Sequence, residues 1–88
     1  MARILVVDDS PTETHQFVNA LAKNGHQVLT AASGSDGISI AAEEKPDIIL
    51  MDVVMPGING FQATRQLTRS ESTAHIPVII VSSKSQDA

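Results

Sequence analysis

The chain has 88 residues, of which 42% are hydrophobic and 18% charged, and it carries a formal net charge of -4 and no cysteine. This length suits one small domain and excludes two, and the lack of cysteine excludes disulfides and thiolate chemistry. The six Lys and Arg residues are scattered, which argues against nucleic acid and favours a protein as the partner. No apolar stretch is long enough to span a bilayer, and Met1-Ala2-Arg3 leads directly into a strand-like run without room for a leader. We therefore expect a cytoplasmic protein with no membrane contact.

Strand-like and helix-like segments alternate from the first residues onward. The hydrophobic runs predict strands over residues 4–7, 28–31, 47–51 and 78–81. The strand at 47–51 is expected to be buried on both faces, as is typical of a parallel sheet. Because helical segments separate these strands, the pattern favours right-handed crossovers and one parallel sheet.

Three helices are predicted between the strands. Ser10-Pro11-Thr12-Glu13 has the form of a capping box with proline at the first helical position, and Asn24-Gly25 is a natural stop. Ser33 can cap the second helix, which Pro46 ends, and the third runs from about residue 61 to 69. The residues expected to face the core have helical spacing: Phe17, Val18, Leu21 and Ala22 in the first helix; Ile38, Ala41 and Ala42 in the second; Phe61, Thr64 and Leu67 in the third.

Polar residues whose side chains can react or bind a metal follow three of the predicted strands. Asp8 and Asp9 come after the first strand, Asp52 after the third and Ser82 after the fourth. Taken singly, each reads as an ordinary strand exit, turn residue or helix cap. Taken together, they meet at the carboxyl edge of a parallel sheet, where ligands bind. Clustered carboxylates repel one another unless a cation lies among them, so we predict a divalent metal beside a reactive aspartate.

The order of these motifs resembles the receiver domain of two-component response regulators. The resemblance is carried by three stretches: Val6-Val7-Asp8-Asp9-Ser10; Leu50-Met51-Asp52-Val53-Val54-Met55-Pro56-Gly57 with Asn59-Gly60; and Ile76-Pro77-Val78-Ile79-Ile80-Val81-Ser82. It implies one domain over residues 1–88, with a flavodoxin-like doubly wound α/β sheet of strand order 2-1-3-4. The stretch 59–67 is also similar to stand-alone receivers of type IV pilus chemosensory systems, which control twitching motility.

The resemblance implies a signalling module rather than an enzyme, and it assigns a role to each site residue. Asp52 is the expected acceptor of a phosphoryl group from a histidine kinase or phosphotransfer domain. Asp9, Asp52 and the backbone carbonyl of Val54 are the expected ligands of Mg²⁺, with Asp8 acting through water. Ser82 is the expected switch hydroxyl, which turns toward the new phosphate and passes the signal to a downstream protein.

The sequence also departs from the family's pattern. It stops at Ala88, before the fifth strand, the phosphate-contacting lysine and the last two helices of the family, and Lys84 lies in the loop after Ser82. We therefore expect a C-terminally truncated receiver that forms a homodimer or higher assembly, joined through the fourth strand, the uncovered face of the sheet or an exchange of elements between chains. Two alternatives stay open: a Mg²⁺-dependent phosphatase with an Asp nucleophile, whose usual spacing Asp8-Asp9 lacks, and an interaction domain that works without phosphorylation.

Overall fold

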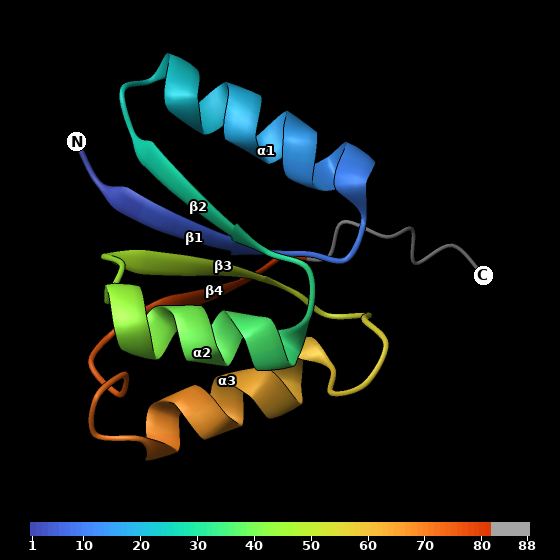
Figure 1. Ribbon diagram of the computed structural model, residues 1–88, viewed down its shortest axis with the longest axis vertical. Helices are drawn as coiled ribbons and strands as arrows, with labels where there is room; N and C mark the ends of the chain where they lie inside the picture. Colours follow the sequence, from blue (N-terminus) through green and yellow to red (C-terminus); the bar gives the residue numbers. More distant parts are fainter. Residues whose placement is uncertain (82–88) are drawn as a thin grey trace.

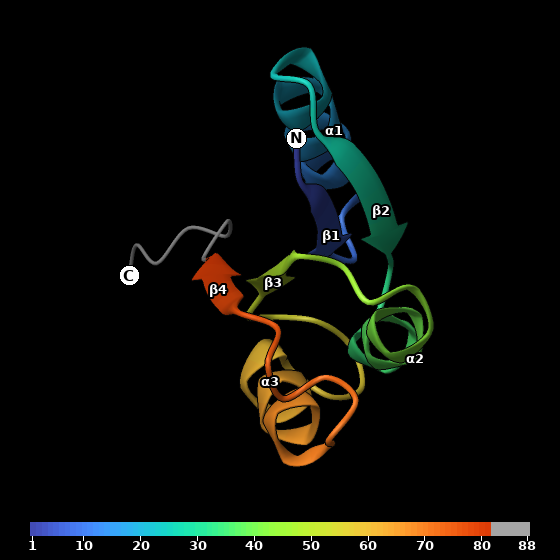
Figure 2. The same ribbon diagram turned by 90° about the vertical axis from the view of Figure 1, so that its left-hand side faces the viewer.

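The computed structural model describes residues 1–81, in which strands and helices alternate. The elements in chain order are β1 (Arg3–Val7), α1 (Pro11–Lys23), β2 (Gln27–Ala31), α2 (Gly34–Glu44), β3 (Ile48–Asp52), α3 (Gly60–Arg69) and β4 (Val78–Val81). The sheet is parallel throughout, with the order β2-β1-β3-β4. Helix α1 covers one face while α2 and α3 cover the other, as Figure 1 and the side view in Figure 2 show. The predicted doubly wound α/β sheet of order 2-1-3-4 is confirmed.

Alternate strand residues divide between the two faces of the sheet. On the face toward α2 and α3, Leu5, Ile49 and Met51 are fully buried, and each such side chain stabilises the fold by about 1.5–3 kcal/mol. On the opposite face, within the described part of the chain, α1 packs on β1 and β2 but not on β3 or β4, and none of its residues is fully buried. Ile48 and Leu50 of β3 are therefore half-buried. The prediction that this strand is buried on both faces is correct for one face only.

Each helix begins at a polar N-cap residue that accepts a hydrogen bond from the backbone N–H three residues later. The N-caps are Ser10, Ser33 and Asn59, with donor–acceptor distances of 3.3, 3.1 and 2.8 Å. In α3 the Gln62 side chain also accepts from the Asn59 N–H at 2.8 Å, which completes a reciprocal capping box. None of the helices within residues 1–81 is long and apolar enough to cross a membrane.

The predicted capping box of α1 is only half formed. Ser10 Oγ accepts from the Glu13 N–H, but the Ser10 N–H donates to Asp8 Oδ1 at 2.9 Å instead of to Glu13. Glu13 Oε1 is consequently buried with no hydrogen-bond partner among residues 1–81. Asp8, which directly follows β1, has taken the place of the glutamate as acceptor, and sequence spacing alone could not reveal this exchange.

Several element bounds differ from the prediction by one residue. β1 begins at Arg3, β2 at Gln27 and α3 at Gly60. β3 includes Asp52 and excludes Asp47, whose carboxylate accepts a hydrogen bond from the Arg3 N–H at 2.8 Å before the strand starts. Asp52 is thus held by strand pairing to Val81, and not by a loop.

Three side chains predicted to face the core are exposed: Ala22, Ala42 and Phe61. In α2 the buried residue is Ala41. Ala42 lies about 100° further around the helix and therefore faces away from the core. Phe61 is 57% exposed for the same reason, because α3 packs through its neighbour Gly60. The buried face of α3 consists of Gly60, Ala63 and Leu67.

Candidate functional site

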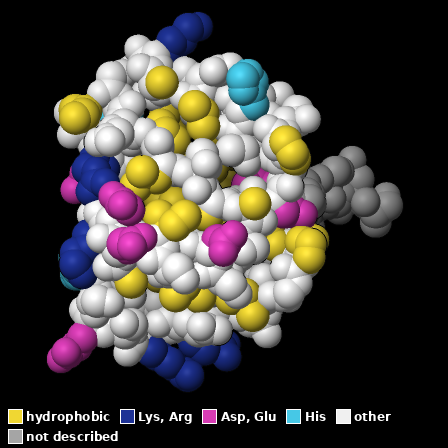
Figure 3. Space-filling view, in the orientation of Figure 1, with side chains coloured by type: hydrophobic (Ala, Val, Ile, Leu, Met, Phe, Trp, Pro, Cys, Tyr) yellow, Lys and Arg dark blue, Asp and Glu magenta, His cyan; other side chains and the backbone are white. Residues whose placement is uncertain are grey.

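Three aspartates from two neighbouring strands meet at the carboxyl edge of the sheet. Asp8 and Asp9 directly follow β1, and Asp52 is the last residue of the adjacent strand β3. One carboxylate oxygen from each lies within 4.8 Å of the others. Asp8 and Asp52 are buried, with exposures of 4% and 3%, whereas Asp9 is partly exposed. Asp and Glu side chains reach the surface among hydrophobic ones on the face in Figure 3.

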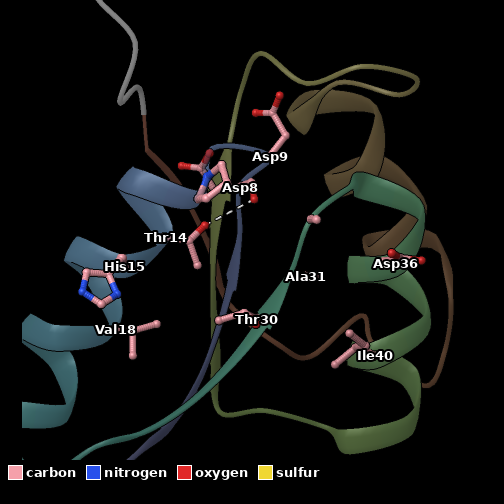
Figure 4. A pocket seen from close by; sticks show the side chains of 11 residues that line it. Asp8, Asp9, Thr14, His15, Val18, Thr30, Ala31, Asp36 and Ile40 are labelled. Atoms are coloured by element: carbon pink, nitrogen blue, oxygen red, sulfur yellow. Dashed lines mark hydrogen bonds between the residues drawn. The ribbon is translucent and has the colours of Figure 1, made fainter.

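Asp8 is fixed by its own backbone and by the start of α1. Its N–H continues the sheet by donating to the Ala31 carbonyl at 3.0 Å. Its Oδ1 accepts from the Ser10 N–H, and its carbonyl accepts from the Thr14 hydroxyl at 3.4 Å, the bond dashed in Figure 4. Asp8 therefore orients the turn into α1 while it contributes charge to the cluster. Sequence analysis did not single out Thr14, because a threonine in a first helical turn is common.

Asp52 is held by the close approach of α3 to the end of β3. The Gly60 N–H donates to the Val53 carbonyl at 2.9 Å. A side-chain Cβ at position 60 would lie 2.9 Å from the Asp52 carbonyl carbon and closer still to its oxygen, which real Cβ atoms do not allow. Gly60 is the first residue of α3, and its lack of a side chain lets the helix contact the strand end. Gly57, with φ +79°, is a turn glycine in the loop before α3.

The donor set fits a hard divalent cation. All three ligand groups are carboxylates, which bind Mg²⁺ well, and their mutual repulsion at this range favours a bound cation. Opposite ligands in a Mg²⁺ shell lie about 4.2 Å apart. The 4.8 Å limit on the oxygens is compatible with two carboxylates that bind directly and one that binds through water.

The structure brings together the predicted residues Asp8, Asp9 and Asp52. Val54 lies two residues beyond Asp52 in the loop before α3, and its side chain is 53% exposed. Ser82 and Lys84 lie outside the described residues. Val81, which precedes Ser82, is paired with Asp52 across β3 and β4.

Comparison with known proteins identifies the class of this domain. The sequence profile of the response regulator receiver domain matches residues 4–88. The chain belongs to this family of two-component signalling modules.

Individual members of the family resemble this chain in sequence and in structure. Protein PilH of Pseudomonas aeruginosa is 62% identical over 87 residues, which are 99% of this chain and 72% of PilH. Among solved structures, the N-terminal domain of a response regulator receiver protein from Methanoculleus marisnigri has a TM-score of 0.92 and 31% identity, covering 99% of this chain and 71% of that one. Chemotaxis protein CheY4 of Vibrio cholerae has a TM-score of 0.89 and 28% identity, covering 98% of this chain and 72% of that one. The family is a signalling module rather than an enzyme, which decides against the phosphatase alternative.

Proposed function

We propose that this domain accepts a phosphoryl group on Asp52 from the phosphohistidine of a kinase or phosphotransfer domain. The observation that carries the proposal is the convergence of three carboxylates at the carboxyl edge of the sheet, with the buried Asp52 at the end of β3. In this reaction a carboxylate oxygen of Asp52 bonds to phosphorus, the P–N bond breaks, and its electron pair stays on the imidazole. The product is an acyl phosphate on a rigid strand end.

The local bonding supports Asp52 over its two neighbours as the acceptor. Asp8 already uses Oδ1 to hold the Ser10 N–H, so its carboxylate also has a structural task. Asp9 is partly exposed and belongs to the turn that leads into α1. Asp52 is fixed by strand pairing on one side and by the contact with Gly60 on the other, which suits a group that must meet an incoming phosphorus in one orientation.

Asp9, Asp52 and the carbonyl of Val54 would hold Mg²⁺ directly, with Asp8 acting through water. When bound, the cation would neutralise charge on the transferring phosphoryl group. The chain itself supplies the carboxylate oxygens at fixed positions, and the burial of Asp8 and Asp52 limits the access of water to them.

The signal would leave through the end of β4. Val81 is paired with Asp52, so Ser82, the next residue along the chain, is suited by its position in the sequence to act as the switch hydroxyl. Phosphorylation adds charge and strong acceptor oxygens at Asp52, and a hydrogen bond from Ser82 would draw the following loop inward. A downstream protein would bind this altered surface. The resemblance of residues 59–67 to stand-alone receivers of type IV pilus chemosensory systems supports a cytoplasmic role in the control of twitching motility, and the 62% identity to PilH is consistent with that resemblance.

Labelling with radioactive acetyl phosphate tests the acceptor. Asp52→Asn should abolish incorporation. Asp36→Asn removes the same negative charge from an exposed position, and this variant should be labelled like the wild type. Asp9→Ala should lower Mg²⁺ affinity and slow labelling without unfolding the domain. Wild-type labelling of Asp52→Asn would overturn the assignment. If partner binding needs neither Asp52 nor phosphate, the domain works as an interaction module without phosphorylation.

A further inference from the structure

A groove of about 520 Å³ runs between α1 and α2 along the outer strand β2. In Figure 4, Val18 of α1 and Ile40 of α2 lie on either side of β2, which contributes Thr30 and Ala31. Its volume falls within the range of ligand-binding pockets. Asp8 and Asp9 line one end, but most of the groove lies outside the acidic cluster.

The floor of this groove is the edge of the sheet. β2 pairs only with β1 among the described residues. The Gln27 N–H donates to the Ala2 carbonyl, and the Ala31 carbonyl accepts from the Asp8 N–H, so Gln27 and Ala31 direct their backbone groups toward β1. In a parallel ladder, alternate residues direct these groups to opposite sides. The N–H and C=O groups of Val28 and Thr30 therefore point away from β1 at the open edge of the sheet, and Thr30 lines the groove.

The negative charge of the groove favours a positively charged ligand. Its lining contains three carboxylates, those of Asp8, Asp9 and Asp36, and none of the described residues that line it is Lys or Arg. Lys and Arg side chains lie at the periphery of the view in Figure 3, while hydrophobic and acidic side chains occupy its centre. An open strand edge recognises an extended peptide through backbone hydrogen bonds, and the flanking side chains select its sequence.

We propose that the outer edge of β2 binds an extended, basic segment of a partner protein. The segment pairs with the outward backbone groups of Val28 and Thr30. Because side chains of a strand alternate between two faces, one side chain of the segment meets Val18 of α1 and the next meets Asp36 and Ile40 of α2. An apolar residue suits the first position and Lys or Arg the second. The proposal does not depend on phosphorylation of Asp52.

The test uses ¹⁵N-labelled protein and an acetylated eight-residue peptide of alternating valine and arginine. Peptide addition should shift the amide signals of β2. Thr30→Pro removes the N–H that donates to the peptide and should weaken peptide binding about tenfold or more. A tenfold loss of affinity corresponds to roughly 1.4 kcal/mol, the contribution of about one hydrogen bond. Thr30→Val is the matched control, because it keeps the N–H and should bind like the wild type. Proline is tolerated at an edge position whose N–H is outside the ladder, so the variant should fold; Val28→Pro is a second variant of the same kind.

Charge is tested separately through Asp36, which lies outside the acidic cluster. Asp36→Asn should weaken the arginine peptide several-fold, and a valine–glutamate peptide should not bind the wild type. Equal affinity of Thr30→Pro and Thr30→Val, or shifts confined to other strands, would overturn the proposal. Spermidine serves as a cation that cannot pair with a strand. If it shifts the same amide signals and binds as tightly as the peptide, the groove binds cations without strand pairing and the proposal is overturned.

Discussion

Gly60→Ala should damage the phosphorylation site without removing any of its functional groups. Gly60 is the first residue of α3 and lies against the last residue of β3. A Cβ there would lie 2.9 Å from the Asp52 carbonyl carbon and 3.0 Å from Val53 Cα, with the Asp52 carbonyl oxygen nearer still. All of these neighbours are backbone atoms, so no flexible side chain can move aside.

The size of the effect follows from these distances. Ordinary contact begins at 3.4 Å, so the helix and the strand end must separate by at least about 0.5 Å, and by on the order of 1 Å to clear the oxygen. Overpacking of this kind costs roughly 1–3 kcal/mol of the free energy of unfolding. A shift of about 1 Å at a reacting group can slow a reaction by roughly 100-fold. Phosphorylation should therefore suffer much more than folding.

Two measurements separate the effects: urea unfolding, and the initial rate of labelling by acetyl phosphate with Mg²⁺. Gly25→Ala is the matched control, because Gly25 has φ +84° with open space around its Cβ position and lies at the far end of α1. It should lose about 1 kcal/mol of stability from the strained backbone and be labelled at the wild-type rate. Wild-type labelling of a folded Gly60→Ala variant would refute the argument that this contact positions Asp52.

Two further predictions concern a helix cap and the edge of the sheet. Gln62→Ala should lower the free energy of unfolding by about 1 kcal/mol, whereas Glu13→Ala should change it little, because only Gln62 returns a hydrogen bond to its N-cap; equal losses in urea titrations would contradict this. The 88-residue chain should sediment as a homodimer at micromolar concentration, because β4 pairs only with β3 among the described residues and Ile79 is 47% exposed. Ile79→Lys should shift it to monomer while Phe61→Lys on α3 should not, and a monomeric wild type would exclude association through β4.

The sheet could be predicted because its signals are local and periodic. Each strand is a short apolar run, and the helices between them carry polar caps. The convergence of Asp8, Asp9 and Asp52 then follows from topology, since β1 and β3 are neighbours and end at the same edge. What a sequence pattern specifies is the order and direction of the strands, and this was sufficient to find the acidic cluster.

The contacts that position the cluster could not be predicted, because they depend on distances between elements. Gly60 looks like any turn glycine until α3 is seen against the end of β3. Glu13 has the spacing of a capping residue, but the Ser10 N–H donates to Asp8 Oδ1 instead. Phe61 lies three residues before Thr64, which is a helical spacing, yet α3 packs through Gly60, Ala63 and Leu67 and leaves Phe61 exposed. In each case a tertiary contact overrode a local preference.

The two proposed sites share residues, and this has a thermodynamic consequence. Asp8 and Asp9 belong both to the acidic cluster and to the end of the β2 groove. A cation held by the cluster neutralises part of the charge that attracts a basic segment, and a bound segment places positive charge near the cation site. By linkage, whatever factor Mg²⁺ applies to the affinity for the segment, the segment must apply to the affinity for Mg²⁺. Occupancy of the groove can therefore bias the phosphorylation chemistry through charge alone, without any movement of α1 or α2.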